Sequence, residues 1–184
     1  MVTQVIIKGT TIRKYITFQV AQTLFQSMVM SHLDYGNSLL YGISEHLLTK
    51  LQRVQNAAGR VILEYTKYDH ITPGLVKLHW LPIKYRILFK IAMITYKVLS
   101  TNQPKYLRQL LVFQNNRRSL RSGSENLLKV PKTKLKSAGD RSFALAAPTI
   151  WNSLPKTVKE APSLPMFKKE LKTHYFRSAY KYLL

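Results

Sequence analysis

The sequence contains no cysteine. Disulfide bonds, a cysteine nucleophile and cysteine-ligated zinc are therefore excluded. The absence agrees with an intracellular protein, in the nucleus or the cytoplasm, and this is the location that we expect.

Long apolar runs are also missing. No stretch approaches the roughly 20 apolar residues that cross a bilayer. The richest stretch, residues 83–99, is interrupted by Lys84, Arg86, Lys90 and Lys97. The first residues show no basic region followed by an apolar block, which is the pattern of a secretory signal. We therefore expect a chain that is neither secreted nor transmembrane.

Acidic residues are scarce. Only 8 Asp and Glu oppose 29 Lys and Arg, which gives a net charge of +21. A compact fold with this charge repels itself, and a bound polyanion would offset the repulsion. Nucleic acid is the first candidate for this partner, and an anionic membrane surface is the second. Hydrophobic residues make up 46% of the 184 residues, which argues for a real core and against disorder throughout.

The patterns that carry catalysis are missing as well. The acidic residues form no D-x-D or E-x-x-E pair for two-metal chemistry, and no two histidines have the H-x-x-x-H spacing of a metal site. There is no phosphate-binding loop, no G-x-G-x-x-G and no G-x-S-x-G. We predict no catalytic residue, no metal site, no cofactor and no small-molecule substrate, so the chain is not expected to be an enzyme on its own.

What is present is a helical pattern over most of the chain. Apolar residues over 47–65 alternate at spacings of four and three, which predicts an amphipathic helix capped by Ser44. Residues 83–100 predict a helix that is apolar on nearly every side, as in the centre of a bundle. Thr17 would cap an earlier helix that ends near residue 31, and Ser163 would open the last one.

These patterns predict a mainly α fold, a helical bundle with one small β-hairpin near residues 126–137. We divide the chain into an N-terminal extension over 1–16, a helical bundle over 17–112, and a third part over 113–184. The third part would hold a basic loop, the hairpin and the C-terminal helices. Small residues at 57–59 would let another helix approach closely.

The hairpin prediction rests on the basic segment, which we define as residues 117–141. Turn-forming residues surround a short apolar run there, and Pro131 would end the first of two strands. A flexible, solvated loop is the alternative. Eight cations of this segment are predicted to contact phosphates: Arg117, Arg118, Arg121, Lys129, Lys132, Lys134, Lys136 and Arg141.

A second set of cations follows one face of the predicted helix over 83–100. Arg86, Lys90 and Lys97 are spaced by four and seven residues, so they share a stripe. The stripe is either the solvent face of the helix or a basic ridge that binds nucleic acid, and we include its three residues among the predicted contacts.

Many tyrosines stand beside cations. Because cations bind phosphates and aromatic faces stack on unpaired bases, we expect one or two of these rings at most to stack. No base-reading motif is present, so we expect recognition of shape and backbone. The pairs are Lys14–Tyr15, Lys67–Tyr68, Tyr85 between Lys84 and Arg86, Tyr96–Lys97, Lys105–Tyr106, and Lys181 between Tyr180 and Tyr182.

Seven blocks of the sequence resemble a known family, in order and spacing. Six of the blocks are HLDYGNSLLYG (32–42), LQRVQNAAGRVI (51–62), DHITP (69–73), LHWLPIKYRI (78–87), AAPTIWNSLP (146–155) and APSLPMFKKELKTHYF (161–176), and the seventh is the segment over 117–143. Together they look like the C-terminal part of reverse transcriptases from non-LTR (LINE-type, jockey-like) retrotransposons. The similarity covers roughly residues 10–180.

The resemblance implies the thumb and the region downstream of it in an RNA-directed DNA polymerase, so the bundle over 17–112 is expected to be thumb-like. The paired aspartates of that family lie in a Phe/Tyr-x-Asp-Asp motif, which this chain lacks. No catalytic residue is carried over. The chain has Gly36 where the family commonly has Cys, and Gly59 where it usually has Ala.

We therefore expect a nucleic-acid-binding fragment of a retrotransposon reverse transcriptase, which grips RNA or DNA by its backbone. An upstream polymerase palm would be a further partner. One alternative is a structural or protein-interaction fragment without activity of its own, because a thumb without its palm exposes apolar surface. The other is a basic membrane-surface protein, since the last predicted helix is basic and aromatic.

Overall fold

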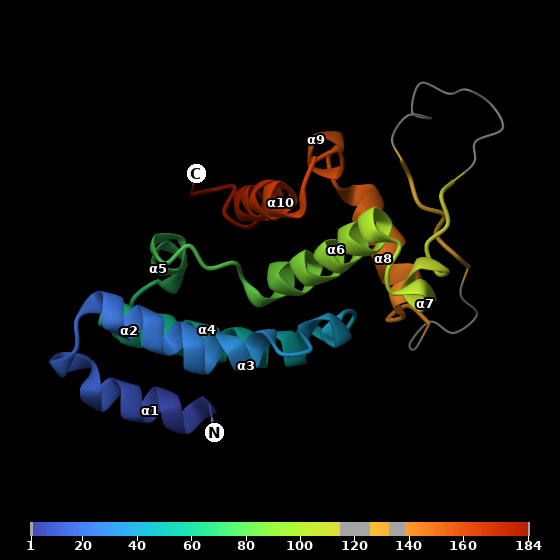
Figure 1. Cartoon of the computed structure of the whole chain (residues 1–184). Coiled ribbons are helices and arrows are strands. Elements are labelled where there is room, and N and C mark those ends of the chain that lie inside the picture. Colours follow the sequence, from blue (N-terminus) through green and yellow to red (C-terminus); the bar gives the residue numbers. More distant parts are fainter. Residues whose placement is uncertain (1, 115–125, 133–138, 184) are drawn as a thin grey trace. The chain divides into compact units, whose positions relative to one another are not determined.

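The computed structural model describes residues 2–114, 126–132 and 139–183, and the regular structure in these ranges is helical (Figure 1). The prediction of a mainly α fold is confirmed. The α-helices are α1 (Val2–Ile12), α2 (Phe18–Phe25), α3 (Ser31–Asp34), α4 (Glu45–Leu63), α5 (Ile71–Lys77), α6 (Ile83–Thr101), α7 (Lys105–Arg108), α8 (Phe143–Ser153), α9 (Lys156–Lys159) and α10 (Leu164–Ala179). Short 3-10 helices cover Arg13–Tyr15 and Asn37–Leu40.

Several helix starts follow the predicted caps. The Thr17 side chain accepts a hydrogen bond from the Val20 backbone N–H at 3.4 Å at the start of α2. The helix then continues through a wider π turn, Gln26–Met30, into α3. Ser44 precedes α4 as predicted, although its side chain makes no capping bond. The predicted helix over 83–100 is confirmed as α6.

Helix α1 lies in the stretch for which the sequence predicted no element. Its sequence is rich in β-branched residues, which have low helix propensity and hide the pattern. Gly9 lets α1 lie directly against the buried Phe25, because a Cβ atom at this position would stand 2.4 Å from the Cζ atom of Phe25. Packing on α2 therefore accounts for a helix that propensity does not indicate.

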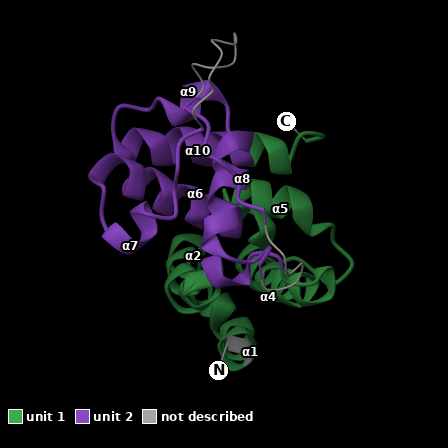
Figure 2. Cartoon of the chain, turned by 90° about the vertical axis from the view of Figure 1, so that its right-hand side faces the viewer, with its two compact units in different colours: residues 1–37, 43–86, 176–184 green, residues 38–42, 87–175 purple. Residues whose placement is uncertain are grey.

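The chain folds into two compact units, each built from separated stretches (Figure 2). The first holds residues 1–37, 43–86 and 176–184, and the second holds residues 38–42 and 87–175. The domain boundaries that the sequence suggested after residues 16 and 112 stay predictions.

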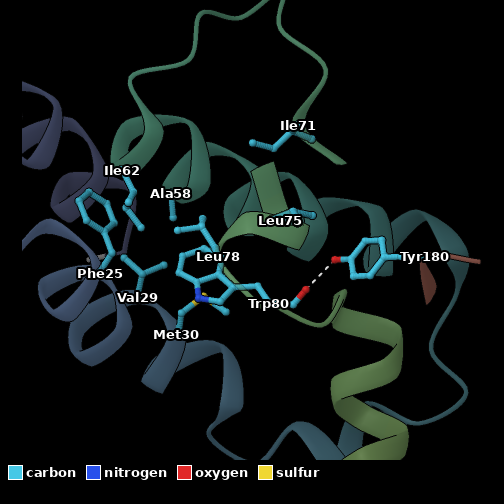
Figure 3. Packing of buried hydrophobic residues seen from close by; sticks show 10 residues of the cluster. All are labelled: Phe25, Val29, Met30, Ala58, Ile62, Ile71, Leu75, Leu78, Trp80 and Tyr180. Atoms are coloured by element: carbon cyan, nitrogen blue, oxygen red, sulfur yellow. Dashed lines mark hydrogen bonds between the residues drawn. The ribbon is translucent and has the colours of Figure 1, made fainter. Parts of the chain in front are cut away.

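The core of the first unit gathers side chains from α2, α4, α5 and the C-terminal residues (Figure 3). Within it, the Tyr180 hydroxyl donates a hydrogen bond to the Trp80 carbonyl oxygen at 2.6 Å. The predicted close approach at residues 57–59 is confirmed, since a Cβ atom on Gly59 would lie 3.4–3.6 Å from side chains of α5 and of Leu78. The buried residues of this core are Phe25, Val29, Met30, Ala58, Ile62, Ile71, Leu75, Leu78, Trp80 and Tyr180.

The core of the second unit is formed by α6, α8 and α10. Tyr96 stacks on Phe167 with ring centroids 4.2 Å apart, and the Trp151 ring lies 6.2 Å from Phe167. The Tyr96 hydroxyl donates to the Ala161 carbonyl oxygen at 2.7 Å. Helix α8 continues past Pro148, and Pro148, Ala147 and Ile150 are all buried.

The predicted β-hairpin is wrong over residues 126–132, the part of its range that the structure describes. Leu128 instead forms an isolated antiparallel bridge with Phe113. On its other side, the Leu128 N–H donates to Asn152 Oδ1 at 2.9 Å, and Asn152 Nδ2 donates to the Leu128 carbonyl oxygen at 2.8 Å. The side-chain amide of α8 thus occupies the backbone groups that a second strand would need. Residues 133–137 lie outside the described residues.

In the described ranges, no helix combines the length and the apolar character that crossing a membrane requires.

Candidate nucleic-acid interface

The predicted phosphate contacts divide into two groups. Five of them fall outside the described residues: Arg117, Arg118, Arg121, Lys134 and Lys136. The other six belong to three parts of the chain, which are residues 126–132 with Lys129 and Lys132, the turn before α8 with Arg141, and α6 with Arg86, Lys90 and Lys97.

Residues 126–132 hold exposed lysines on an anchored backbone. Leu128 is fully buried, and its backbone groups are bound by Asn152. The Trp151 Nε1–H donates to the Asn126 carbonyl oxygen at 3.0 Å. Lys129 and Lys132 are exposed on this segment. Helix α8 therefore fixes the backbone at Asn126 and Leu128, directly before Lys129 and four residues before Lys132.

The same bridge holds residues 112–114 beside residues 127–129 of the basic segment. The Gln114 N–H donates to the Leu127 carbonyl oxygen at 2.8 Å, and the Lys129 N–H donates to the Val112 carbonyl oxygen at 2.7 Å. Residues 114 and 127 are therefore held side by side, and the predicted contacts at 117, 118 and 121 fall between them in the sequence.

A second cation flanks this bridge. The Arg108 guanidinium lies 5.8 Å from the Phe113 ring centroid. Its Nε donates to Asn102 Oδ1 at 2.9 Å and its Nη1 donates to the Leu111 carbonyl oxygen at 2.6 Å. The sequence did not predict Arg108 as a contact. Its position beside the bridge depends on the pairing of residues 112–114 with 127–129, which only the fold supplies.

Arg141 is exposed and anchored at the same time. Its Nε donates to the Gly42 carbonyl oxygen at 3.0 Å, within the second unit. Gly42 has φ +71°, and a Cβ atom there would lie 3.0 Å from Arg141 Cγ. Glycine thus provides both the left-handed backbone and the space that the arginine stem fills.

The predicted stripe on α6 contains one residue with a structural partner. Arg86 forms a two-point ion pair with Asp34, with Nε to Oδ1 at 2.8 Å and Nη2 bonded to Oδ2. Its side chain is only 14% exposed, and Asp34 also accepts from Asn37 Nδ2 at 3.2 Å. Lys90 is half-buried and Lys97 is exposed. The charge of Arg86 is therefore compensated inside the first unit, which leaves Lys97 as the exposed cation of the stripe.

Helix α10 adds cations that were not among the predicted contacts. Phe167, Leu171 and Tyr175 face the core, as the sequence indicated. Lys168, Lys169 and Lys172 are exposed on the opposite side, in the second unit. Their spacing of one, three and four residues places them together on the helix surface.

The described residues contain no group of three or more His, Asp or Glu that could hold a metal ion. The chemistry of the interface rests on exposed ammonium and guanidinium groups, which can bind phosphate oxygens by charge and hydrogen bonds.

Comparison with protein-family models, with curated proteins and with solved structures finds no match for this chain. The resemblance to LINE-type reverse transcriptases therefore stays a prediction from the sequence blocks.

Proposed function

We propose that this chain is a nucleic-acid-binding C-terminal fragment, the thumb and downstream region, of a non-LTR retrotransposon RNA-directed DNA polymerase, and that it lacks the polymerase's catalytic motif. It binds RNA or DNA through the phosphate backbone. The observation that carries the proposal is the anchored backbone at residues 126–129, which presents Lys129, and three residues later Lys132, inside the basic segment in a chain of charge +21.

The physical basis is the release of counterions from the nucleic acid. Each cation that neutralises a phosphate frees a condensed counterion, so affinity falls as salt rises. A fixed backbone lowers the conformational entropy that the contact costs, because fewer side-chain and main-chain torsions have to be ordered on binding. Lys129, on its anchored backbone, therefore favours a docking surface over a solvated loop.

The test is fluorescence-anisotropy binding of the chain to a labelled RNA–DNA hybrid across a salt series. If six to eight cations contact phosphates, log affinity falls with log salt with a slope of roughly −5 to −7. Replacing Arg117, Arg118 and Arg121 together with Gln flattens this slope. The double change K129Q/K132Q flattens it by about 2, because roughly one unit is lost for each phosphate contact.

The matched control is K8Q/K50Q, which removes two exposed lysines of the first unit. It has the same effect on net charge and leaves the slope nearly unchanged. A slope that K129Q/K132Q does not alter, or that the control alters equally, would contradict docking at residues 126–132. Weak binding that is indifferent to salt would contradict the proposal as a whole.

A protein-interaction role is the second candidate. Leu110, Val112, Phe113 and Val130 are exposed at or near the bridge, and such apolar surface is typical of a contact with another protein. Size-exclusion chromatography at high salt, without nucleic acid, distinguishes the two. Self-association there that V112S/V130S removes would favour the interaction role.

A further inference from the structure

Burial separates the tyrosines that stand beside cations. Tyr96 and Tyr180 are buried, and Tyr85 is half-buried. Four are exposed, namely Tyr15 at 76%, Tyr68 at 85%, Tyr106 at 68% and Tyr182 at 97%. In the Lys14–Tyr15 and Lys67–Tyr68 pairs, the ammonium group of the preceding lysine lies 4.9 Å from the ring centroid. The rings of Tyr15 and Tyr68 therefore contribute little to the core and are accessible at the surface.

Both rings belong to the first unit, and one side chain ties their segments together. Arg13 donates from Nε to the Ile62 carbonyl oxygen at 3.0 Å and pairs through Nη2 with Glu64 Oε1 at 3.0 Å. Tyr15 is two residues after Arg13, and Tyr68 is four residues after Glu64. The Tyr15 segment lies between α1 and α2, the Tyr68 segment follows α4, and α4 contacts both α1 and α2.

The backbone under each ring is held locally. Tyr15 ends the 3-10 helix, and Arg13 Nη1 donates to the Ile16 carbonyl oxygen at 2.9 Å. In the second segment, Asp69 accepts hydrogen bonds from the Thr66 N–H and hydroxyl. These bonds lower the pKa of the Asp69 carboxyl, so the carboxylate that accepts them stays ionised to lower pH than a free aspartate. Two rings on ordered turns cost little entropy to engage.

The charges around the rings favour an anion. Lys14 and Lys67 lie at the rings, and Lys77 lies 6.0 Å from the Phe18 ring centroid at the start of α2. The acidic groups of these segments are already bonded, Glu64 to Arg13 and Asp69 to Thr66. A partner that combines flat aromatic groups with regularly spaced negative charge fits this arrangement.

We propose that Tyr15 and Tyr68 form a platform for single-stranded nucleic acid, with unpaired bases stacked on the two rings and Lys14 and Lys67 at the adjoining phosphates. A lysine over one face of an exposed ring leaves the other face for a base. The proposal is independent of the interface in the second unit, because it uses other residues and a single strand in place of a duplex.

The test compares two labelled strands of equal length, oligothymidylate and an abasic strand with the same phosphates. Anisotropy is measured at raised salt, where phosphate contacts contribute least. The double change Y15A/Y68A weakens binding of oligothymidylate about tenfold or more, since each base stacked on an aromatic ring is worth a factor of this order. Binding of the abasic strand does not change. Y15F/Y68F keeps both rings and retains the affinity.

The matched control is Y35A/Y182A, which removes two tyrosines of the same unit that are 91% and 97% exposed. It leaves both affinities unchanged. Equal affinity of Y15A/Y68A and the unchanged chain for oligothymidylate would overturn the proposal. An equal loss of affinity for oligothymidylate and for the abasic strand would also overturn it. So would binding to anionic vesicles combined with equal affinity of the unchanged chain for the two strands.

A crosslinking measurement in the unchanged chain needs no variant. Photo-crosslinks from a 5-iodouracil strand should map to the peptides that contain Tyr15 and Tyr68, and crosslinks confined to other peptides would overturn the platform. The two proposals fail separately. K129Q/K132Q changes the salt slope for the hybrid and leaves the difference between base-bearing and abasic strands intact.

Discussion

Arg86 illustrates how one residue's role depends on a partner that the local sequence does not reveal. Spacing alone places it on a stripe with Lys90 and Lys97, as a potential phosphate contact. In the structure, its guanidinium is bound at two points by Asp34, 52 residues away, and its side chain is mostly buried. A paired, shielded cation releases few counterions on binding, so its contribution to affinity is expected to be small.

At the residue scale, we predict that Asp34→Asn lowers the free energy of unfolding by about 1–2 kcal/mol. The change leaves the Arg86 charge without its partner, and the side chain of Asp34 is 38% exposed, so the loss is smaller than for a fully buried pair. Urea denaturation measures it. Glu160→Gln is the control, because it breaks an exposed pair with Lys156 and costs well under 1 kcal/mol.

A change of Arg86 itself tests whether the stripe on α6 binds nucleic acid. Arg86→Gln should leave the salt slope for the RNA–DNA hybrid unchanged, whereas a flatter slope would restore Arg86 to the interface.

At the scale of elements, two glycines show how helices are brought together. Gly9 of α1 stands against the ring of the fully buried Phe25, and Gly59 of α4 faces side chains at ordinary contact distance. Both lie inside helices, where alanine is intrinsically favoured over glycine by about 1 kcal/mol. The two sites therefore differ in the space for one methyl group and not in backbone preference.

We predict opposite signs for the same substitution at these sites. Gly59→Ala raises the free energy of unfolding by up to about 1 kcal/mol, because the new methyl group meets Ile71 at 3.4 Å and the helix gains propensity. Gly9→Ala lowers it by about 1–2 kcal/mol, since its Cβ would stand 2.4 Å from a rigid ring and overpacking costs more than propensity returns. Urea denaturation of both variants decides, and equal stabilities would show that α1 does not dock on Phe25.

At the scale of the whole molecule, the excess of positive charge dominates. A net charge of +21 on 184 residues opposes the compact state, and the ion pairs Arg13–Glu64 and Arg86–Asp34 compensate only a small part of it. Salt screens repulsion among exposed charges beyond the Debye length, which is about 10 Å at 0.1 M. The stability of the free chain should therefore depend on ionic strength.

We predict that the melting temperature rises as NaCl increases from a few millimolar to roughly 0.3 M, because screening relieves this repulsion. Calorimetry measures the rise. A variant with Gln at six exposed lysines, Lys8, Lys50, Lys84, Lys168, Lys169 and Lys172, should melt higher at low salt and rise less. A melting temperature that falls with salt, or the same rise in both chains, would contradict the argument.

The sequence by itself determined the helical class, the course of α4, α6 and α10, and the inward face of α10. Periodic apolar residues and caps such as Thr17 are local signals, and neighbours along the chain are enough to read them. The sequence also shows the excess of cations and the absence of catalytic patterns. The excess of cations predicts nucleic acid as the partner.

The tertiary structure decided which chemically similar residues are accessible. Tyr15 and Tyr68 are exposed, whereas Tyr96 and Tyr180 are buried. Arg86 is paired with Asp34, and the backbone of Leu128 is bonded to Asn152 where a second strand was predicted. The tertiary structure also formed α1, whose β-branched sequence hides its helix. The physical reason is common to all of these: each outcome rests on contacts between residues distant along the chain, such as Tyr180 and Trp80, 100 residues apart, and local spacing carries no information about such partners.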